Sequence, residues 1–91
     1  MANYKRSTHA LVKQAGEELV VLHSKSGNYY TLNPLGRQIW DFCQTPKSEE
    51  EIVGFISKEH GVAIETARTD VVDYLESLVA ENIFVKYSPE K

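Results

Sequence analysis

The sequence predicts an α+β fold, in which a three-stranded antiparallel sheet is followed by three helices. Three segments rich in β-branched and aromatic residues, joined by short turns, occupy the first third of the chain. After Asn33-Pro34 the apolar residues recur every three or four positions, which is the helical period. At 91 residues the chain makes one domain with a single modest core.

The first strand is predicted only weakly, by His9 to Val12 within residues 8–13. Glu18–His23 is the strongest strand and is apolar on both faces, which predicts a central place in the sheet. Gly16, in the turn between these two, can take a positive φ. The third strand is Tyr29–Leu32, and the short connections favour antiparallel pairing.

The first helix is predicted from Pro34 to about Gln44. Asn33 suits the N-cap, and proline is favoured at the first helical position because no amide proton is needed there. Leu35, Ile39, Trp40 and Cys43 form its apolar stripe. Thr45-Pro46 ends the helix, because the residue before a proline avoids the α region.

Ser48 and Glu51 have the spacing of a capping box and predict the start of a second helix, which Gly61 ends. The third helix is predicted from Glu65 or Thr66 to about Glu81, with Asn82 as its C-terminal cap. Its apolar stripe is Ala67, Val71, Tyr74, Leu75 and Leu78. Residues 83–87 are again β-like and predict either a short strand or an apolar tail packed on the helices.

The polar ends of the chain limit the predicted domain to residues 9–87, with a flexible N-terminus at 1–8 and a tail at 88–91. The net charge of −3 gives no basic footprint for nucleic acid. No apolar run has the length of a signal peptide or a membrane span, so neither is expected. A single cysteine excludes an internal disulfide. We therefore expect a cytoplasmic domain with no membrane partner.

No set of residues predicts an enzyme, a metal site or a cofactor. The three histidines are far apart in the sequence and lack metal-ligand spacing. Cys43 lies on an apolar stripe, where cysteine behaves as a small hydrophobe. Asp70 and Asp73 would form an acid–base pair only in a pocket that raised one pKa, so solvated carboxylates are the favoured interpretation. A binding protein is favoured over a catalyst.

Two alternatives to peptide binding stay open at this point. Three helices followed by β-like residues suggest a winged helix that binds DNA. The recognition helix would however carry Arg68 among five acidic residues, which opposes contact with phosphate. In the other alternative, the edge of the third strand pairs with a copy of itself, giving an assembly module. A monomer or a weak dimer is expected.

The edge of the third strand also fits a peptide, because an open edge supplies main-chain donors and acceptors for an added strand. Tyr29 and Tyr30 would place amphipathic rings beside that edge. The competing interpretation is that one or both tyrosines complete the core, and Tyr30 shares its parity with Leu32.

The order and spacing of several short motifs resemble the PqqD family of leader-peptide-binding domains, also called RiPP recognition elements. The similarity covers about residues 9–85. The motifs are Tyr30-x-Leu32-Asn33-x-x-Gly36-x-x-Ile39-Trp40, Glu51-Ile52 and Asp70-Val71-x-x-Tyr74-Leu75-x-x-Leu78. The family fold is a three-stranded antiparallel sheet followed by three helices, related to winged helices. The pattern of the quinone-cofactor branch is incomplete here.

The resemblance implies a non-catalytic adaptor that adds the leader of a ribosomally made precursor to the third strand. Its partner would be a maturation enzyme, either a leader peptidase of the lasso-peptide type or a radical SAM enzyme. The implied groove is Asn28, Tyr29, Tyr30, Thr31 and Leu32 on one side and Ala67, Arg68, Asp70, Val71, Tyr74, Leu75 and Leu78 on the other. Leu32, Ile39, Trp40 and Leu75 are assigned to the core. Tyr29, Tyr30, Thr31, Arg68, Val71 and Tyr74 are assigned to the groove, where Arg68 would meet leader carboxylates.

Overall fold

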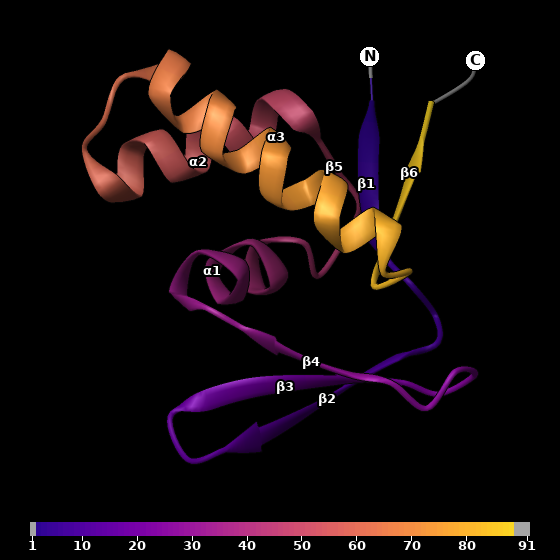
Figure 1. Ribbon diagram of the computed structural model, residues 1–91. Helices are drawn as coiled ribbons and strands as arrows, with labels where there is room; N and C mark the ends of the chain where they lie inside the picture. Colours follow the sequence, from indigo (N-terminus) through magenta and orange to yellow (C-terminus); the bar gives the residue numbers. More distant parts are fainter. Residues whose placement is uncertain (1, 89–91) are drawn as a thin grey trace.

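The computed structural model describes residues 2–88 and has a helical layer, one sheet beneath it and a second sheet beside it (Figure 1). The elements are, in chain order, β1 (Asn3–Arg6), β2 (Ala10–Ala15), β3 (Glu18–His23), β4 (Tyr29–Leu32), α1 (Pro34–Phe42), β5 (Lys47–Ser48), α2 (Glu49–His60), α3 (Ile64–Ala80) and β6 (Phe84–Tyr87). The predicted α+β class is confirmed, and its winged-helix likeness is only loose. Within the described residues no helix is both long enough and apolar enough to cross a bilayer.

The predicted sheet is present, with antiparallel strands in the order β2-β3-β4. β3 is the central strand, as its apolar character predicted. A two-residue turn joins Ala15 to Glu18, and Gly16 takes φ +66° there. Leu19, Val21 and His23 on β3 alternate with partly exposed residues and are buried towards the helices.

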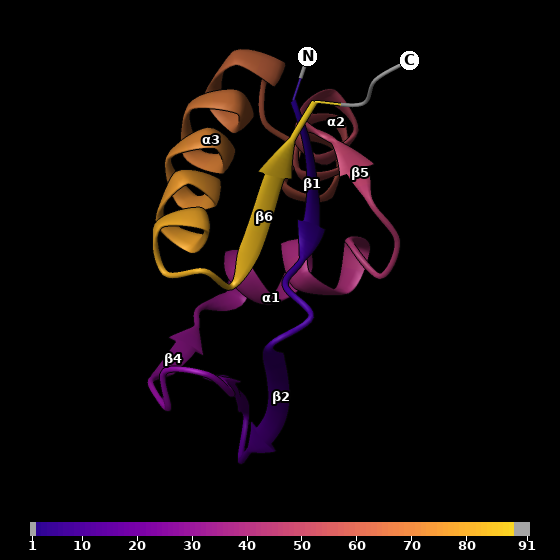
Figure 2. The ribbon, with the colours of Figure 1, turned by 90° about the vertical axis from the view of Figure 1, so that its right-hand side faces the viewer.

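A second antiparallel sheet, in the order β5-β1-β6, was not predicted (Figure 2). The expectation of a flexible N-terminus is wrong for residues 3–6, which pair with β6 over their whole length. The Tyr4 side chain is fully buried, and the Arg6 guanidinium lies 4.2 Å from the centroid of the Trp40 ring. The domain therefore begins at β1. Of the two alternatives for residues 83–87, the strand is correct, and residues 89–91 of the expected tail lie outside the described residues.

The helix ends follow their predicted caps. The Asn33 side chain accepts a hydrogen bond from the Gly36 amide at 2.7 Å. Ser48 and Glu51 form the capping box of α2, and Gly61 ends that helix in the left-handed conformation. Asn82 takes φ +64° after α3, where the Ile83 amide donates to the Leu78 carbonyl at 2.9 Å.

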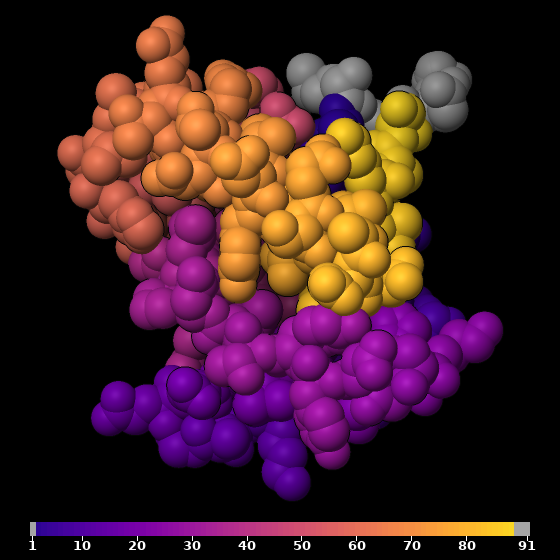
Figure 3. Space-filling view, viewed as in Figure 1, coloured from indigo at the N-terminus to yellow at the C-terminus, as the bar shows by residue number. Residues whose placement is uncertain are grey.

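The core lies between the helices and the inner face of the β2-β3-β4 sheet. The four residues assigned to it from the sequence are all buried: Leu32, Ile39, Trp40 and Leu75. A Cβ built on Gly36 would overlap the ring and hydroxyl of Tyr74, so a larger residue would force Tyr74 to shift where α1 approaches α3. In the space-filling view, α3 (orange to yellow) lies directly over the magenta atoms of β4 and α1 (Figure 3).

Candidate peptide-binding site

The main chain of β4 forms an open edge of the β2-β3-β4 sheet, because within residues 2–88 it pairs with β3 alone. The His23 amide donates to the Asn28 carbonyl at 2.9 Å, so these opposed residues form a hydrogen-bonded pair. Hydrogen-bonded and non-hydrogen-bonded pairs alternate along an antiparallel ladder. Tyr30 and Leu32 therefore bond to β3. The main-chain groups of Tyr29 and Thr31 point to the open edge.

The side chains of β4 alternate between the two faces of the sheet. Tyr29 and Thr31 are exposed on the outer face, away from the helices, and Tyr29 is 72% exposed. Tyr30 is opposite Val21 and Leu32 is opposite Leu19, so both face the helices. Tyr30 is half-buried against the rim of the core, which answers the question raised by its parity with Leu32.

The Tyr30 phenol reaches the C-terminal end of α3. The Glu81 side chain, with a smaller effect of burial, raises the pKa of Tyr30. The Asn28 side-chain amide donates to the Tyr30 hydroxyl at 3.4 Å. The Tyr30 phenol thus lies between the open strand and the end of α3.

Most of the predicted groove residues on α3 belong to the core. Ala67, Val71, Leu75 and Leu78 are between 0% and 4% exposed. For Val71 this corrects the assignment to the groove, because a side chain without exposed surface contributes packing and not contact with a ligand. The reason is geometric: Val71 lies on the same helical face as Leu75 and Leu78, and that face covers the core.

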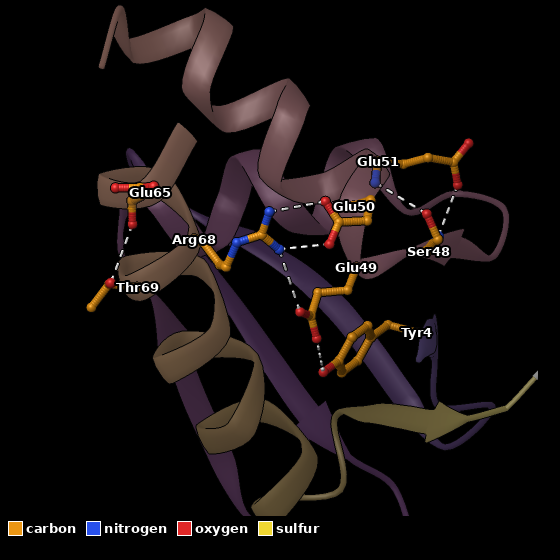
Figure 4. A network of polar contacts seen from close by, with 8 residues as sticks. All are labelled: Tyr4, Ser48, Glu49, Glu50, Glu51, Glu65, Arg68 and Thr69. Carbon is orange, nitrogen blue, oxygen red and sulfur yellow. Dashed lines mark hydrogen bonds and ion pairs between the residues drawn. The ribbon is translucent and has the colours of Figure 1, made fainter. Parts of the chain in front are cut away.

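Arg68 forms ion pairs with the start of α2 (Figure 4). Its guanidinium makes a two-pronged contact with Glu50 at the start of α2, with N–O distances of 2.6 and 3.1 Å. Glu49 lies 3.9 Å from the same guanidinium. Hydrogen bonding to Glu50 raises the pKa of Arg68. This side chain therefore joins α3 to α2, and its contact with leader carboxylates stays a prediction.

The accessible part of α3 borders a hollow of about 280 Å³. Its lining residues are Leu35, Asp70, Asp73, Tyr74 and Ser77. Asp70 and Tyr74 were predicted at the site, whereas Leu35, Asp73 and Ser77 were missed. Burial raises the pKa of Tyr74, and the nearby Asn33 main chain partly opposes the shift. Asp73 and Ser77 follow Asp70 and Tyr74 at helical spacing, a signal that could have found them.

A second hollow, of about 530 Å³, lies at the other side of the β4–α1 junction. It is lined by Glu17, Glu18, Thr31, Leu32, Asn33, Pro34 and Arg37. Arg37 donates to the Gln14 side chain at 3.2 Å and lies 3.4 Å from the Glu17 carbonyl. Glu17, Glu18 and Arg37 were missed, because they come from the β2–β3 turn, the start of β3 and α1, which no sequence spacing connects.

Among residues 2–88, no group of three or more His, Cys, Asp or Glu side chains is placed so that it could hold a metal ion. His9 and His23 are closer than their sequence separation indicated, with ring centroids 5.8 Å apart. Burial raises the pKa of the Cys43 thiol to about 11, so this cysteine is a protonated core residue.

Comparison with known proteins gives one family and two solved structures. The family model described as coenzyme PQQ synthesis protein D (PqqD) matches residues 18–83. TbiB1, solved in complex with the TbiA(beta) leader peptide, is 30% identical, with a TM-score of 0.81 over 93% of this chain and 99% of TbiB1. A lasso peptide synthetase B1, complexed with its leader peptide, is 22% identical, with a TM-score of 0.73 over 90% of this chain and 96% of its own, and shows a shared fold. No curated protein matches the sequence.

Proposed function

The chain belongs to the PqqD family, and from this premise we propose that it is a non-catalytic RiPP recognition element that binds the leader segment of a ribosomally synthesised precursor. The observation that carries the proposal is the open edge of β4 beside the accessible part of α3. The two solved structures support it, because both are complexes with leader peptides.

The leader adds to β4 as a further strand. Tyr29 and Thr31 supply the main-chain groups, because the ladder with β3 leaves these two residues unpaired on the open side. A strand that pairs with them is fixed in register, and its own side chains alternate between the two faces of the sheet. Asn28 lies at one end of this edge and Thr31, at the other end, lines the larger hollow.

Leader side chains on the inner face meet the half-buried Tyr30 and the residues of the smaller hollow. Tyr74 and Leu35 supply apolar surface there, and Asp70 and Asp73 supply negative charge. Tyr30 and Leu32 are two residues apart on the inner face, so this part of the site reads every second residue of the leader. The leader arrives disordered, and ordering it uses part of the interaction energy.

In this proposal the domain delivers the bound precursor to a maturation enzyme and performs no chemistry itself. A leader peptidase of a lasso-peptide pathway is the favoured partner, because both similar structures are leader-peptide complexes and one of them is a lasso peptide synthetase B1. A radical SAM enzyme is the alternative that the family allows. The proposal places the domain in the cytoplasm, as a monomer or a weak dimer.

Calorimetric titration with a synthetic leader of the precursor tests strand addition through Thr31→Pro. Proline removes the Thr31 amide proton, and proline is tolerated on a strand edge whose N–H faces solvent. Loss of a hydrogen bond at a desolvated edge, together with the steric effect of the ring, weakens binding by about tenfold or more.

The matched control is Val12→Pro. The Ser24 amide donates to the His9 carbonyl at 2.8 Å, so alternation directs the Val12 main chain to the open edge of β2, as Thr31 is directed on β4. Val12→Pro therefore makes the same change on the other edge and leaves leader affinity within about twofold. Thermal melting verifies that both variants fold. Normal leader binding by folded Thr31→Pro would disprove strand addition at β4.

A further inference from the structure

Five exposed carboxylates surround β4 and its junction with α1. They are Glu17 and Glu18 in the larger hollow, Asp70 and Asp73 in the smaller hollow, and Glu81 near the Tyr30 phenol. The ion pairs of residues 2–88 use other acidic groups, because they join Arg68 to Glu49 and Glu50 and Lys86 to Glu76. The surface beside the open edge therefore carries negative charge that the described part of the chain does not neutralise by ion pairing.

The two hollows differ in the cations that they contain. The larger hollow includes Arg37, so one positive charge already lies beside its two carboxylates. The lining of the smaller hollow has no lysine, arginine or histidine. Asp70 and Asp73 are three residues apart on α3, where side chains are neighbours, so their charges repel each other in the free domain. The smaller hollow is therefore the place where an added cation gains most.

The walls of the smaller hollow suit a long basic side chain. Leu35 of α1 and Tyr74 of α3 provide apolar surface next to Asp70 and Asp73. Lysine and arginine pack their methylene stems on such a surface and keep the charged head at its rim. An acidic side chain would be repelled there, and an apolar one would leave both carboxylates without a partner.

A metal ion is a poor occupant of this hollow. Calcium takes six to eight oxygen ligands, and the lining offers only two carboxylates with the hydroxyls of Tyr74 and Ser77. Among residues 2–88 no group of three or more acidic, histidine or cysteine side chains is placed to hold a metal. The cation that fits is an organic one on a flexible stem.

The position of the hollow indicates where that side chain comes from. Leu32 ends β4 on the inner face of the sheet, and Leu35 follows it three residues later at the start of α1. A strand added to β4 sends every second side chain to this inner face. A leader residue beside the β4–α1 junction can therefore place its side chain between α1 and α3.

We infer that the leader recognised by this domain carries lysine or arginine, and that one such side chain fills the hollow between α1 and α3 with its charge against Asp70 and Asp73. This inference rests on the proposed function, since it requires a leader bound at β4. It goes beyond that function, because it specifies the charge of the leader and the two residues that select it.

The test is a calorimetric titration of the unmodified domain and of the double variant Asp70→Asn/Asp73→Asn. The probes are the synthetic leader and the same peptide with every lysine and arginine replaced by glutamine. Loss of the two carboxylates weakens binding of the natural leader by about fivefold at low salt, and added salt reduces the difference. The neutral peptide binds the unmodified domain about fivefold more weakly or worse, and the double variant binds it no more weakly than the unmodified domain does.

The matched control is Asp41→Asn/Glu59→Gln. It removes the same two charges from exposed positions near the ends of α1 and α2, outside the lining of the smaller hollow, and leaves affinity for the natural leader within about twofold. Thermal melting verifies that both double variants fold.

The outcomes separate this inference from the proposed function. Normal binding of the natural leader by Asp70→Asn/Asp73→Asn overturns the inference and leaves the proposed function intact. An equal loss in the control variant also overturns it, because net charge and not the hollow would then set the affinity. A loss that persists with the neutral peptide, or a natural leader without lysine and arginine, overturns it as well. Failure of the unmodified domain to bind the leader overturns the proposed function itself.

Discussion

The two sheets of this domain are built in opposite ways. The β2-β3-β4 sheet uses three strands that follow one another through short turns, and β4 keeps an open edge. The β5-β1-β6 sheet brings together residues 3–6, 47–48 and 84–87. In that sheet the free side of β6 lies beside α3 (Figure 2), and the one large side chain at the centre of β1, Tyr4, is fully buried.

Under the proposed function, this difference separates stability from recognition. The β5-β1-β6 sheet, which we call the closed sheet, joins the two ends of the chain. It completes the core, because Tyr4 and Phe84 are buried and Arg6 covers Trp40. The sheet that presents an edge can leave Tyr29 and Thr31 unpaired, because the core depends on its inner face alone. Changes in the closed sheet should therefore alter stability, and changes at the open edge should alter binding.

The largest expected effect on stability comes from Tyr4→Ala. Removing a fully buried aromatic side chain costs about 3–5 kcal/mol of unfolding free energy, because a cavity remains in the core. Tyr29→Ala on the open sheet is the matched control, with a cost of less than about 0.5 kcal/mol for a mostly exposed residue. Urea unfolding measures both. A Tyr4→Ala variant as stable as the unmodified chain would show that β1 is not part of the cooperative fold.

The same division explains what could be predicted from the sequence. The β2-β3-β4 sheet depends on local signals, namely alternation, short turns and Gly16, so it could be predicted in order and orientation. The β5-β1-β6 sheet depends on contacts between residues more than 40 positions apart, such as Tyr4 with Lys47 and with Lys86. A four-residue strand that begins with Asn3 has no local signal of that pairing.

The candidate site shows the same limit. The edge strand and the buried stripe of α3 follow from periodicity, yet periodicity does not say which stripe residues reach solvent. Val71 was misassigned for this reason, because the core covers it. The pairing of Arg68 with Glu50 of a different helix could not be read from periodicity either. The hollow at Arg37 joins three segments and is visible only in the folded chain.

A smaller effect is expected at the capping box, where β5 of the closed sheet leads into α2. Hydrogen bonding from the Ser48 main chain lowers the pKa of Glu51 below its ordinary value of 4.5. A lowered pKa stabilises the fold above the ordinary value, and this stability is lost as the pH falls through the folded-state pKa. In a profile of melting temperature against pH, the melting temperature of Glu51→Gln should therefore fall less steeply than that of the unmodified chain on the acid limb, below about pH 5.

Glu59→Gln is the control for that profile, since it removes an exposed carboxylate from the other end of the same helix. It should leave the acid limb unchanged, because Glu59 is far from the capping box. Leader affinity at neutral pH should be the same for both variants if the closed sheet and the open edge are independent. A loss of affinity in Glu51→Gln would break the separation of the two sheets.

The smallest effect is expected from Arg68→Ala. This variant tests whether Arg68 contributes to stability or to leader binding. Arg68 contacts Glu50 and approaches Glu49, and the Glu49 carboxylate accepts a hydrogen bond from Tyr4 at 3.4 Å (Figure 4). These contacts link α3 to α2 and to the closed sheet.

Exposed ion pairs contribute little to stability, so the melting temperature of Arg68→Ala should fall slightly and in a salt-dependent manner. Leader affinity should stay within about twofold, because lost surface ion pairs rarely act beyond their own contacts. The opposite outcome would be a large loss of leader affinity in Arg68→Ala, together with a similar loss when salt is added to the unmodified chain. That result would place Arg68 at the leader-binding surface.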